Sequence, residues 1–189
     1  KRSLIMKNIL TSVLLFVSVY AFAQQKTTPQ KENFDKLVQQ LNLSFTMPEG
    51  FVEVPVIKKS KVIYQYAVKD PKTGFEVRYF ILPADKDEMV DEVDYSLFLV
   101  TTINAMGDKA NTPDIGLFDT KAVKHDFNAD WGANSAFAPG SEFGKSFEFC
   151  SASAIKKHKI GKVYIFWMLT DVKTQEQLMN QTFLNLKFN

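Results

Sequence analysis

The sequence predicts a single domain of the α+β class, in which an antiparallel β-sheet carries helices on both faces as an α/β/α sandwich. Segments with helical periodicity stand before, between and after segments with strand alternation. Short loops, not helical crossovers, join neighbouring strand-like segments, which predicts antiparallel pairing. The last strand-like segment, 162–170, is apolar on both faces and therefore needs cover on both.

The first 23 residues have the three parts of a secretory signal peptide. Basic residues precede an apolar run over 9–20, and Ala21-Phe22-Ala23 forms an A-x-A cleavage site. Met6 is the expected start of translation. The run is shorter than the about 20 residues that cross a bilayer. We therefore expect cleavage near Ala23, no transmembrane segment in the mature chain, and a location in the periplasm or outside the cell.

The rest of the chain has the size and composition of one globular domain. We expect a flexible N-terminal segment at 24–32 and a single domain at 33–189. Hydrophobic residues make up 46% of the sequence and include 17 Phe, which indicates a filled core and not disorder.

Charge and cysteine content exclude further classes. The leader contains three of the 23 basic residues and none of the 21 acidic ones, so acidic residues slightly outnumber basic ones in the mature chain. This balance argues against nucleic-acid binding. Cys150 is the only cysteine, so we expect no internal disulfide and no lipid at the cleavage site.

In the N-terminal half, the first helix is predicted to begin at Pro29, directly after Thr28. Its apolar face follows helical spacing through Phe34, Leu37, Val38 and Leu41. A type I turn is predicted at 47–50 with Gly50 at its last position, and an extended edge segment follows over 51–56.

A β-hairpin is predicted next, because two alternating segments flank the loop 70–74. Four residues of its first strand are expected to share one face: Val62, Tyr64, Tyr66 and Val68. Pro83 is expected to end the second strand. A second helix then starts at Asp91 or Asp94 and ends before Gly107.

The C-terminal half is predicted to hold a third helix, three strands and a last helix. The third helix covers 120–131 and is closed by Gly132. The strands are expected at 134–138, 146–156 and 162–170. A capping box of Thr174 and Gln177 opens the last helix, and its core stripe consists of Met179, Phe183 and Leu186.

The stretch 43–51 combines a strand, a Pro-x-Gly turn and an aromatic residue, and a strand at 161–164 and the closing stretch 184–188 follow near the C-terminus. These segments resemble the opening and the C-terminal pattern of the PsbP-like (Mog/PsbP-like) superfamily. The group includes an extrinsic photosystem subunit, a nuclear-import factor and bacterial envelope lipoproteins. The resemblance implies an α/β/α sandwich used as a binding or assembly module, as in bacterial exported members of unknown function. It implies no catalytic residues, and this chain lacks the lipidation cysteine of the envelope members.

Motifs for catalysis or metal binding are absent from the sequence. The acidic run over 85–94 lacks the ligands and glycine of an EF-hand loop, so we interpret it as a solvated start of the second helix. His125 and His158 have no second ligand at i+3 or i+4. Cys150 is interpreted as a small buried strand residue, not a nucleophile. The sequence therefore predicts no metal, no cofactor and no enzymatic activity.

One candidate interaction segment is the stretch around Trp131. Asn128, Asp130 and Trp131 combine polar groups with a residue type that often anchors interfaces. The alternative is that Trp131 packs inward at a helix end and Gly132 takes a left-handed cap.

A second candidate is a lysine cluster around one turn, Lys156, Lys157, Lys159 and Lys162, with further lysines at 58–61 in another loop. These lysines either contact an acidic partner or anionic lipid, or they are solvated loop tips.

Three functions remain open from the sequence. The main hypothesis is an exported, non-catalytic binding or accessory module of the cell envelope that binds an envelope protein or a small ligand. The second is a carrier of small apolar ligands, with a pocket lined by Tyr64, Tyr79, Phe143 and Trp167. The third is a hydrolytic enzyme whose site is assembled from carboxylates distant in sequence.

Overall fold

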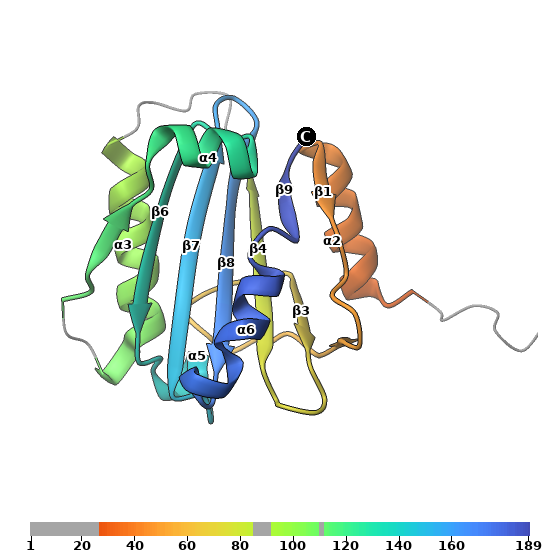
Figure 1. The fold of residues 1–189 in the computed structure, drawn as a ribbon, viewed down its shortest axis with the longest axis vertical. Helices are drawn as coiled ribbons and strands as arrows, with labels where there is room; N and C mark the ends of the chain where they lie inside the picture. Colours follow the sequence, from red (N-terminus) through yellow and green to blue (C-terminus); the bar gives the residue numbers. More distant parts are fainter. Residues whose placement is uncertain (1–26, 85–91, 110–111) are drawn as a thin grey trace, which may run out of the picture.

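The computed structural model describes residues 27–84, 92–109 and 112–189 (Figure 1). The predicted signal peptide, and residues 24–26 of the segment predicted to be flexible, lie outside these ranges. Residues 29–32 of that segment form the first turn of α2 (Pro29–Gln40). Thr28 is its N-cap, and its hydroxyl accepts a hydrogen bond from the Lys31 amide, as expected of a Thr-Pro helix start.

A seven-stranded antiparallel sheet forms the middle layer, in the order β2-β3-β4-β8-β7-β6-β5. Its strands are β2 (Val52–Glu53), β3 (Tyr66–Lys69), β4 (Glu76–Pro83), β5 (Ile115–Leu117), β6 (Trp131–Phe137), β7 (Phe149–Lys157) and β8 (Gly161–Leu169). Each neighbouring pair is antiparallel. The predicted α+β class and antiparallel pairing are confirmed.

Separate hydrophobic cores lie on the two faces of this sheet, as Figure 1 shows from the positions of the helices. One core contains residues of α2, α4 (Thr120–Phe127) and α6 (Val172–Thr182), and we call its face the α6 face. The other contains residues of α3 (Glu92–Met106) and α5 (Ser141–Gly144), and we call its face the α3 face. A short 3₁₀ helix, Gly107–Lys109, follows α3. The expected α/β/α sandwich is confirmed.

The α6 face also carries a small sheet that the sequence analysis did not predict. β1 (Leu43–Phe45) pairs antiparallel with β9 (Leu186–Phe188), the last strand of the chain. Leu186, expected on the stripe of the last helix, therefore lies opposite Phe45 in a strand. Pairing between segments so far apart in sequence leaves no local signal.

The first hairpin strand is shorter than predicted, and its residues do not share one face. Tyr66 and Val68 belong to the α6-face core, whereas Val62 and Tyr64 belong to the α3-face core. Gln65 explains the change, because its side-chain amide bonds the backbone of Ile81, donating to the carbonyl at 2.9 Å and accepting from the amide at 2.8 Å. The side chain thus replaces the backbone partner that a longer β3 would supply.

Three predicted boundaries are wrong: those of the N-terminal turn, the start of the last helix and the end of the third helix. The N-terminal turn spans Pro48–Phe51, with Gly50 third at φ 79°, because glycine adopts positive φ readily. α6 begins at Val172 and is capped by Asp171, whose carboxylate accepts from the Lys173 amide at 2.9 Å, so the Thr174 capping box is not formed.

The third helix ends at Phe127, four residues earlier than predicted. Asn128 takes the left-handed conformation at φ 49°, and the chain then turns into β6, so Trp131 starts a strand. Gly132 lies inside that strand and is not a helix cap. A Cβ there would lie 2.6 Å from a methyl carbon of Val123, so the glycine lets α4 pack closely against β6.

Candidate functional site

The two candidate segments from the sequence meet at one end of the sheet. β6 and β7 pair so that Trp131 lies opposite Lys156, and the Asp130 amide donates to the Lys156 carbonyl at 2.8 Å. We call this region the β6–β7 end. It contains all six candidate residues: Asn128, Asp130, Trp131, Lys156, Lys157 and Lys159.

The end of α4 places the first of these residues. Asn128 tolerates the left-handed conformation better than most side chains, and its amide donates to the Val123 carbonyl. Ala129 follows, fully buried. The reversal at Asn128 directs the exposed Asp130 side chain toward the β7–β8 turn.

Asp130 joins three segments through its carboxylate. Oδ2 accepts a hydrogen bond from the His158 amide at 2.8 Å, and Oδ1 contacts Lys124 Nζ on α4 at 3.1 Å. The His158 amide first, and Lys124 after it, hold the pKa of Asp130 below its ordinary value. The carboxylate therefore stays ionised at neutral pH and ties the β7–β8 turn to α4.

Lys156 is not part of an exposed lysine cluster, contrary to the sequence expectation. Only 2% of its side chain is exposed, and its Nζ lies 2.7 Å from Asp94 Oδ2 in the first turn of α3. Lys162, opposite Lys156 on β8, lies 2.6 Å from Asp94 Oδ1. Both lysines point to the α3 face because the alternation of their strands requires it.

Asp94 corrects a second expectation. The acidic run was interpreted as solvated, but the Asp94 side chain is only 1% exposed and is shared by two lysines. Asp94 lies within α3 and not at its N-cap. Residues 85–91 of the run lie outside the described residues, and Glu92 is the first residue of α3.

Trp131 and Lys157 are half-buried, each for a different reason. Trp131 packs against the α3-face core, so it is neither fully core nor fully surface. Lys157 donates from Nζ to the carbonyl of the last residue, Asn189, at 2.8 Å and lies 5.8 Å from the Phe188 ring centroid. Lys157 therefore anchors the end of β9.

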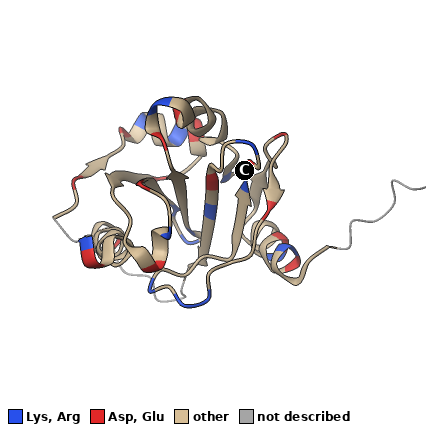
Figure 2. Ribbon diagram, turned by 90° about the horizontal axis from the view of Figure 1, so that it is seen from below, with Lys and Arg blue, Asp and Glu red and all other residues tan. Residues whose placement is uncertain are grey.

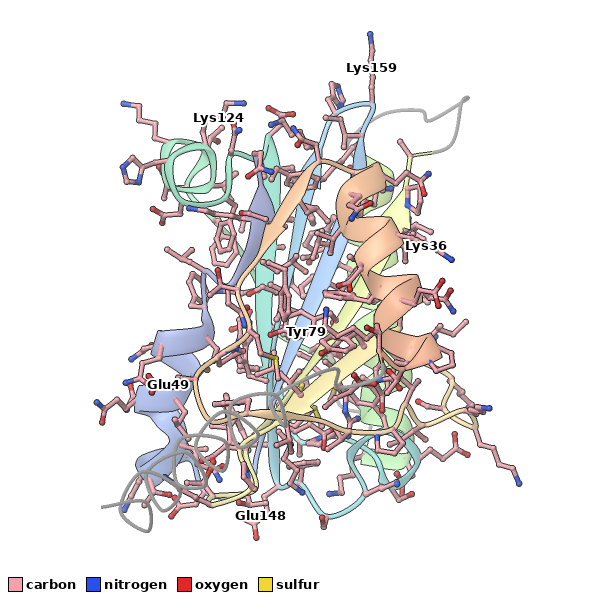
Figure 3. The ribbon with its side chains drawn as sticks, turned by 90° about the vertical axis from the view of Figure 1, so that its right-hand side faces the viewer. Lys36, Glu49, Tyr79, Lys124, Glu148 and Lys159 are labelled. Carbon is pink, nitrogen blue, oxygen red and sulfur yellow. The ribbon has the colours of Figure 1, made fainter. Side chains whose placement is uncertain are left out.

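Lys159 is the most prominent group of the site. It occupies the β7–β8 turn with φ 59°, and Figure 3 shows its side chain extending outward, with Lys124 at the same end of the molecule. Glu148 and Glu49 lie toward the opposite end in the same view. The sequence analysis missed Lys124 and the His158 amide, because their roles depend on the α4 reversal and the β6–β7 register.

Three hollows in the described part of the chain are alternative candidate sites. The largest, about 670 Å³, lies between the start of α2 and the segment 53–56 and is lined by Tyr64 and Gln65. Tyr79 and Trp167, proposed to line a ligand pocket, are fully buried in the α6-face core and line no such hollow. Phe143 borders a separate cleft of about 380 Å³. The third, about 300 Å³, lies over the middle of β5 and β6.

Among the described residues, the candidate reactive groups are the Cys150 thiol and the carboxylates of the 380 Å³ cleft. Burial raises the pKa of the Cys150 thiol, which is fully buried and thus not a ready nucleophile. Asp108 and Glu142 both line the 380 Å³ cleft, together with Lys61. In the described part of the chain no three His, Cys, Asp or Glu side chains come together as metal ligands. Among the described helices, none combines the length and hydropathy needed to cross a bilayer.

Among known proteins, similarity to this chain is found in solved structures. No family model matches the chain, and no curated protein matches it. Among solved structures, the chain is similar to the solution structure of cyanobacterial PsbP (CyanoP) from Synechocystis sp. PCC 6803, at 13% identity and a TM-score of 0.46. The match covers 79% of this chain and 88% of that one. At this identity and TM-score the similarity assigns neither a family nor a binding partner to this chain.

Proposed function

We propose that the mature chain is an exported, non-catalytic binding module of the cell envelope, and that it contacts an acidic protein partner through the β6–β7 end. The observation that carries the proposal is the bridging role of Asp130. Its carboxylate holds the β7–β8 turn against α4. These hydrogen bonds fix the backbone of the turn that carries the exposed His158 and Lys159. A surface held by its own framework loses little conformational freedom on binding.

The charge of this surface favours an acidic partner. Lys124 and Lys159 are exposed at the same end of the molecule, and because Lys124 is paired with Asp130, Lys159 supplies the additional positive charge. Cationic groups at a rim chiefly speed association and set orientation. Trp131, half-buried at the first residue of β6, supplies an aromatic edge of the kind that anchors interfaces.

Export is supported by the leader alone, whose basic start, apolar run and A-x-A site match a secretory signal. Expression of the full chain should yield a mature protein that begins near Gln24, recovered outside the cytoplasm. N-terminal mass analysis of fractionated cells measures both properties. An uncleaved chain in the cytoplasm would remove the envelope from the proposal.

Partner binding is tested by capture of the mature chain's partner from envelope extract after crosslinking. The variant Lys124→Glu with Lys159→Glu should lose most of the captured partner, and Lys159→Glu alone, which leaves the Lys124–Asp130 pair intact, should lose part of it. Because Lys124→Glu breaks that pair, circular dichroism checks that the double variant folds. Lys173→Glu is the matched control, since this exposed lysine lies at the start of α6. Equal capture by the double variant and the control, or capture by neither the wild type nor the control, contradicts the proposal.

A small-ligand carrier is the second candidate, favoured by the 670 Å³ groove, whose volume lies within the range of about 300–1,000 Å³ of ligand sites. Val54, Pro55, Val56 and Tyr64 supply its apolar wall. Several polar groups of the groove are already used, because Gln30 bonds the Val54 carbonyl and the Val56 amide at 2.9 and 3.1 Å. A long-chain fatty acid that raises the melting temperature of wild type, but not of Tyr64→Ala, would favour the carrier over the binding module.

A further inference from the structure

The outward side of α3 is apolar although it faces solvent. Phe98, Thr102 and Ala105 are fully buried against the sheet. At 100° per residue, Val100 and Ile103 lie on the opposite side of the helix. They are 54% and 40% exposed.

Charge is missing from this helix over most of its length. From Tyr95 to Met106 the sequence contains no acidic or basic residue. Tyr95 and Leu97, 41% and 39% exposed, widen the apolar surface. By contrast, the exposed side of α2 carries ion pairs such as Lys36 with Glu32. A helix that is apolar on its solvent side usually has a partner there.

We propose that this outer face of α3 is the contact between two copies of this chain, packed as antiparallel helices across a twofold axis. Ser96, Val100 and Ile103 follow the i, i+4, i+7 spacing of a helix–helix seam. A face without charges meets an identical face without like-charge repulsion. A twofold interface requires such self-complementarity, since the same patch serves both copies.

Charges beyond the two ends of the helix favour the antiparallel orientation. The sequence directly before α3 is acidic, with four carboxylates and one lysine over 85–91. Beside the other end lies an exposed loop with three lysines, Lys58, Lys59 and Lys61 (Figure 2). Lys61 lines the same cleft as Gly107, and the lysines of the loop outnumber the two carboxylates of that cleft, Asp108 and Glu142. Antiparallel copies bring opposite charges and opposite helix dipoles together, whereas parallel copies bring like charges together.

An anionic membrane fits this face less well. Helices that lie on such membranes carry Lys or Arg along their polar side, and α3 has none from Tyr95 to Met106. The acidic sequence before it would also be repelled by anionic lipid. A second copy is therefore the occupant that the charges favour.

The molecular mass of the protein in solution tests whether two copies associate through this face. Analytical ultracentrifugation of the mature chain should show a concentration-dependent dimer, and Val100→Lys should weaken dimerisation at least about tenfold. Val52→Lys is the matched control, because Val52 is 49% exposed on the edge strand β2 and lies outside the face. Circular dichroism checks that both variants fold. A wild-type chain that stays monomeric up to about 100 µM, or a Val100→Lys variant that dimerises normally, overturns the proposal.

Disulfide trapping tests the orientation. With a rise of about 1.5 Å per residue, antiparallel helices that pair Ser96 with Ile103 bring position 100 close to its own copy and hold the two positions 103 about 10 Å apart. Val100→Cys should then crosslink to itself and Ile103→Cys should not, while a mixture of Ser96→Cys and Ile103→Cys should crosslink. Cys150 is fully buried and does not compete. Self-crosslinking of Ile103→Cys indicates parallel copies and overturns the antiparallel arrangement.

Vesicle flotation tests whether a lipid surface, and not a second copy, covers the outer face of α3. The wild-type chain should not float with vesicles that contain phosphatidylserine. Flotation that Val100→Lys abolishes, without a dimer in solution, would assign the face to lipid and overturn the proposal. The dimer and the partner surface at the β6–β7 end are independent, because Lys124→Glu with Lys159→Glu changes no residue of the α3 face.

Discussion

The two faces of the seven-stranded sheet are packed with different chemistry. On the α6 face, Phe34 stacks on Tyr66 with ring centroids 4.4 Å apart, and buried polar atoms meet neutral partners. The Tyr79 hydroxyl accepts from Asn185 at 2.6 Å, and Trp167 Nε1 donates to the Thr182 hydroxyl at 3.0 Å.

The α3 face buries charged groups instead. Arg78 is 1% exposed, with its Nε 2.7 Å from Glu76 and its guanidinium 4.8 to 5.5 Å from three aromatic ring centroids, those of Phe143, Tyr64 and Phe147. Asp94, Lys156 and Lys162 form a second charged cluster at the sheet end.

The difference indicates how each layer is positioned. Apolar packing is non-directional. The aromatic rings on the α6 face therefore stabilise the fold chiefly by being buried and do not require one exact geometry. Charged groups in a buried site must meet oppositely charged partners, so Asp94 fixes where the first turn of α3 sits on the sheet. We therefore expect the α3 face to respond sharply to the loss of one charged partner and weakly to the loss of all of them.

The largest effect is expected from Asp94→Leu, which removes the carboxylate that both buried lysines contact. We expect a loss of about 3–5 kcal/mol in the free energy of unfolding, measured by urea denaturation. Adding Lys156→Met and Lys162→Met should recover most of that loss, because apolar replacement of a whole buried cluster is often neutral.

The matched control for this cluster is Lys159→Met, a lysine of the adjoining turn that is exposed. Its effect should stay below about 0.5 kcal/mol. Similar losses for Asp94→Leu and Lys159→Met would mean that the buried cluster does not position α3, and the contrast between the two faces would fail.

A smaller effect on both faces is expected at alkaline pH. Burial raises the pKa of Tyr66 on the α6 face and of Tyr164 on the α3 face, each to about 12. An unfolded tyrosine ionises near about 10, so the stabilisation is complete below that pH and is lost as the pH rises toward 12.

Tyr66→Phe and Tyr164→Phe should each reduce this alkaline loss of stability, measured by urea denaturation from neutral to alkaline pH. Tyrosinate absorbance of the folded protein should show the missing titration in each variant. A pH dependence that is the same in both variants as in wild type would show that these hydroxyls ionise as in the unfolded chain.

The smallest effect is expected at the β6–β7 end. The Asp130 side chain is 41% exposed, so Asp130→Asn should lower stability by less than about 1 kcal/mol at neutral pH. Because the pKa of Asp130 is lowered on folding, its contribution is present above the unfolded value and is lost as the pH falls through the lower folded value. Wild type should therefore lose slightly more stability than the variant on acidification, and an equal loss would contradict the bridging role of Asp130.

Much of the secondary structure could be predicted because its signals are local. Helical spacing predicted α2 from Thr28 and Pro29, and strand alternation predicted β4, β7 and β8. The missed ends, at Phe127 and Asp171, depended on which of several polar residues takes the cap. Local sequence offers more than one cap, and packing chooses between them.

The candidate site was predicted in pieces. Both segments were recognised by residue type, but their contact depends on the Trp131–Lys156 register, which no local pattern specifies. A signal for the burial of Lys156 did exist, since it shares strand parity with Cys150, Ala152 and Ala154. The sequence interpretation grouped Lys156 with the neighbouring lysines of the turn and did not use that alternation.

The sequence alone determined the α+β class, the antiparallel pairing and the need for cover on both sides of β8, because periodicity and turn chemistry act over a few neighbouring residues. Tertiary structure alone decided that β1 pairs with β9, that Asp94 lies between two lysines, and that Asp130 ties α4 to the β7–β8 turn. These contacts join residues distant in the chain, and their stability depends on burial, which exists only once the layers have packed.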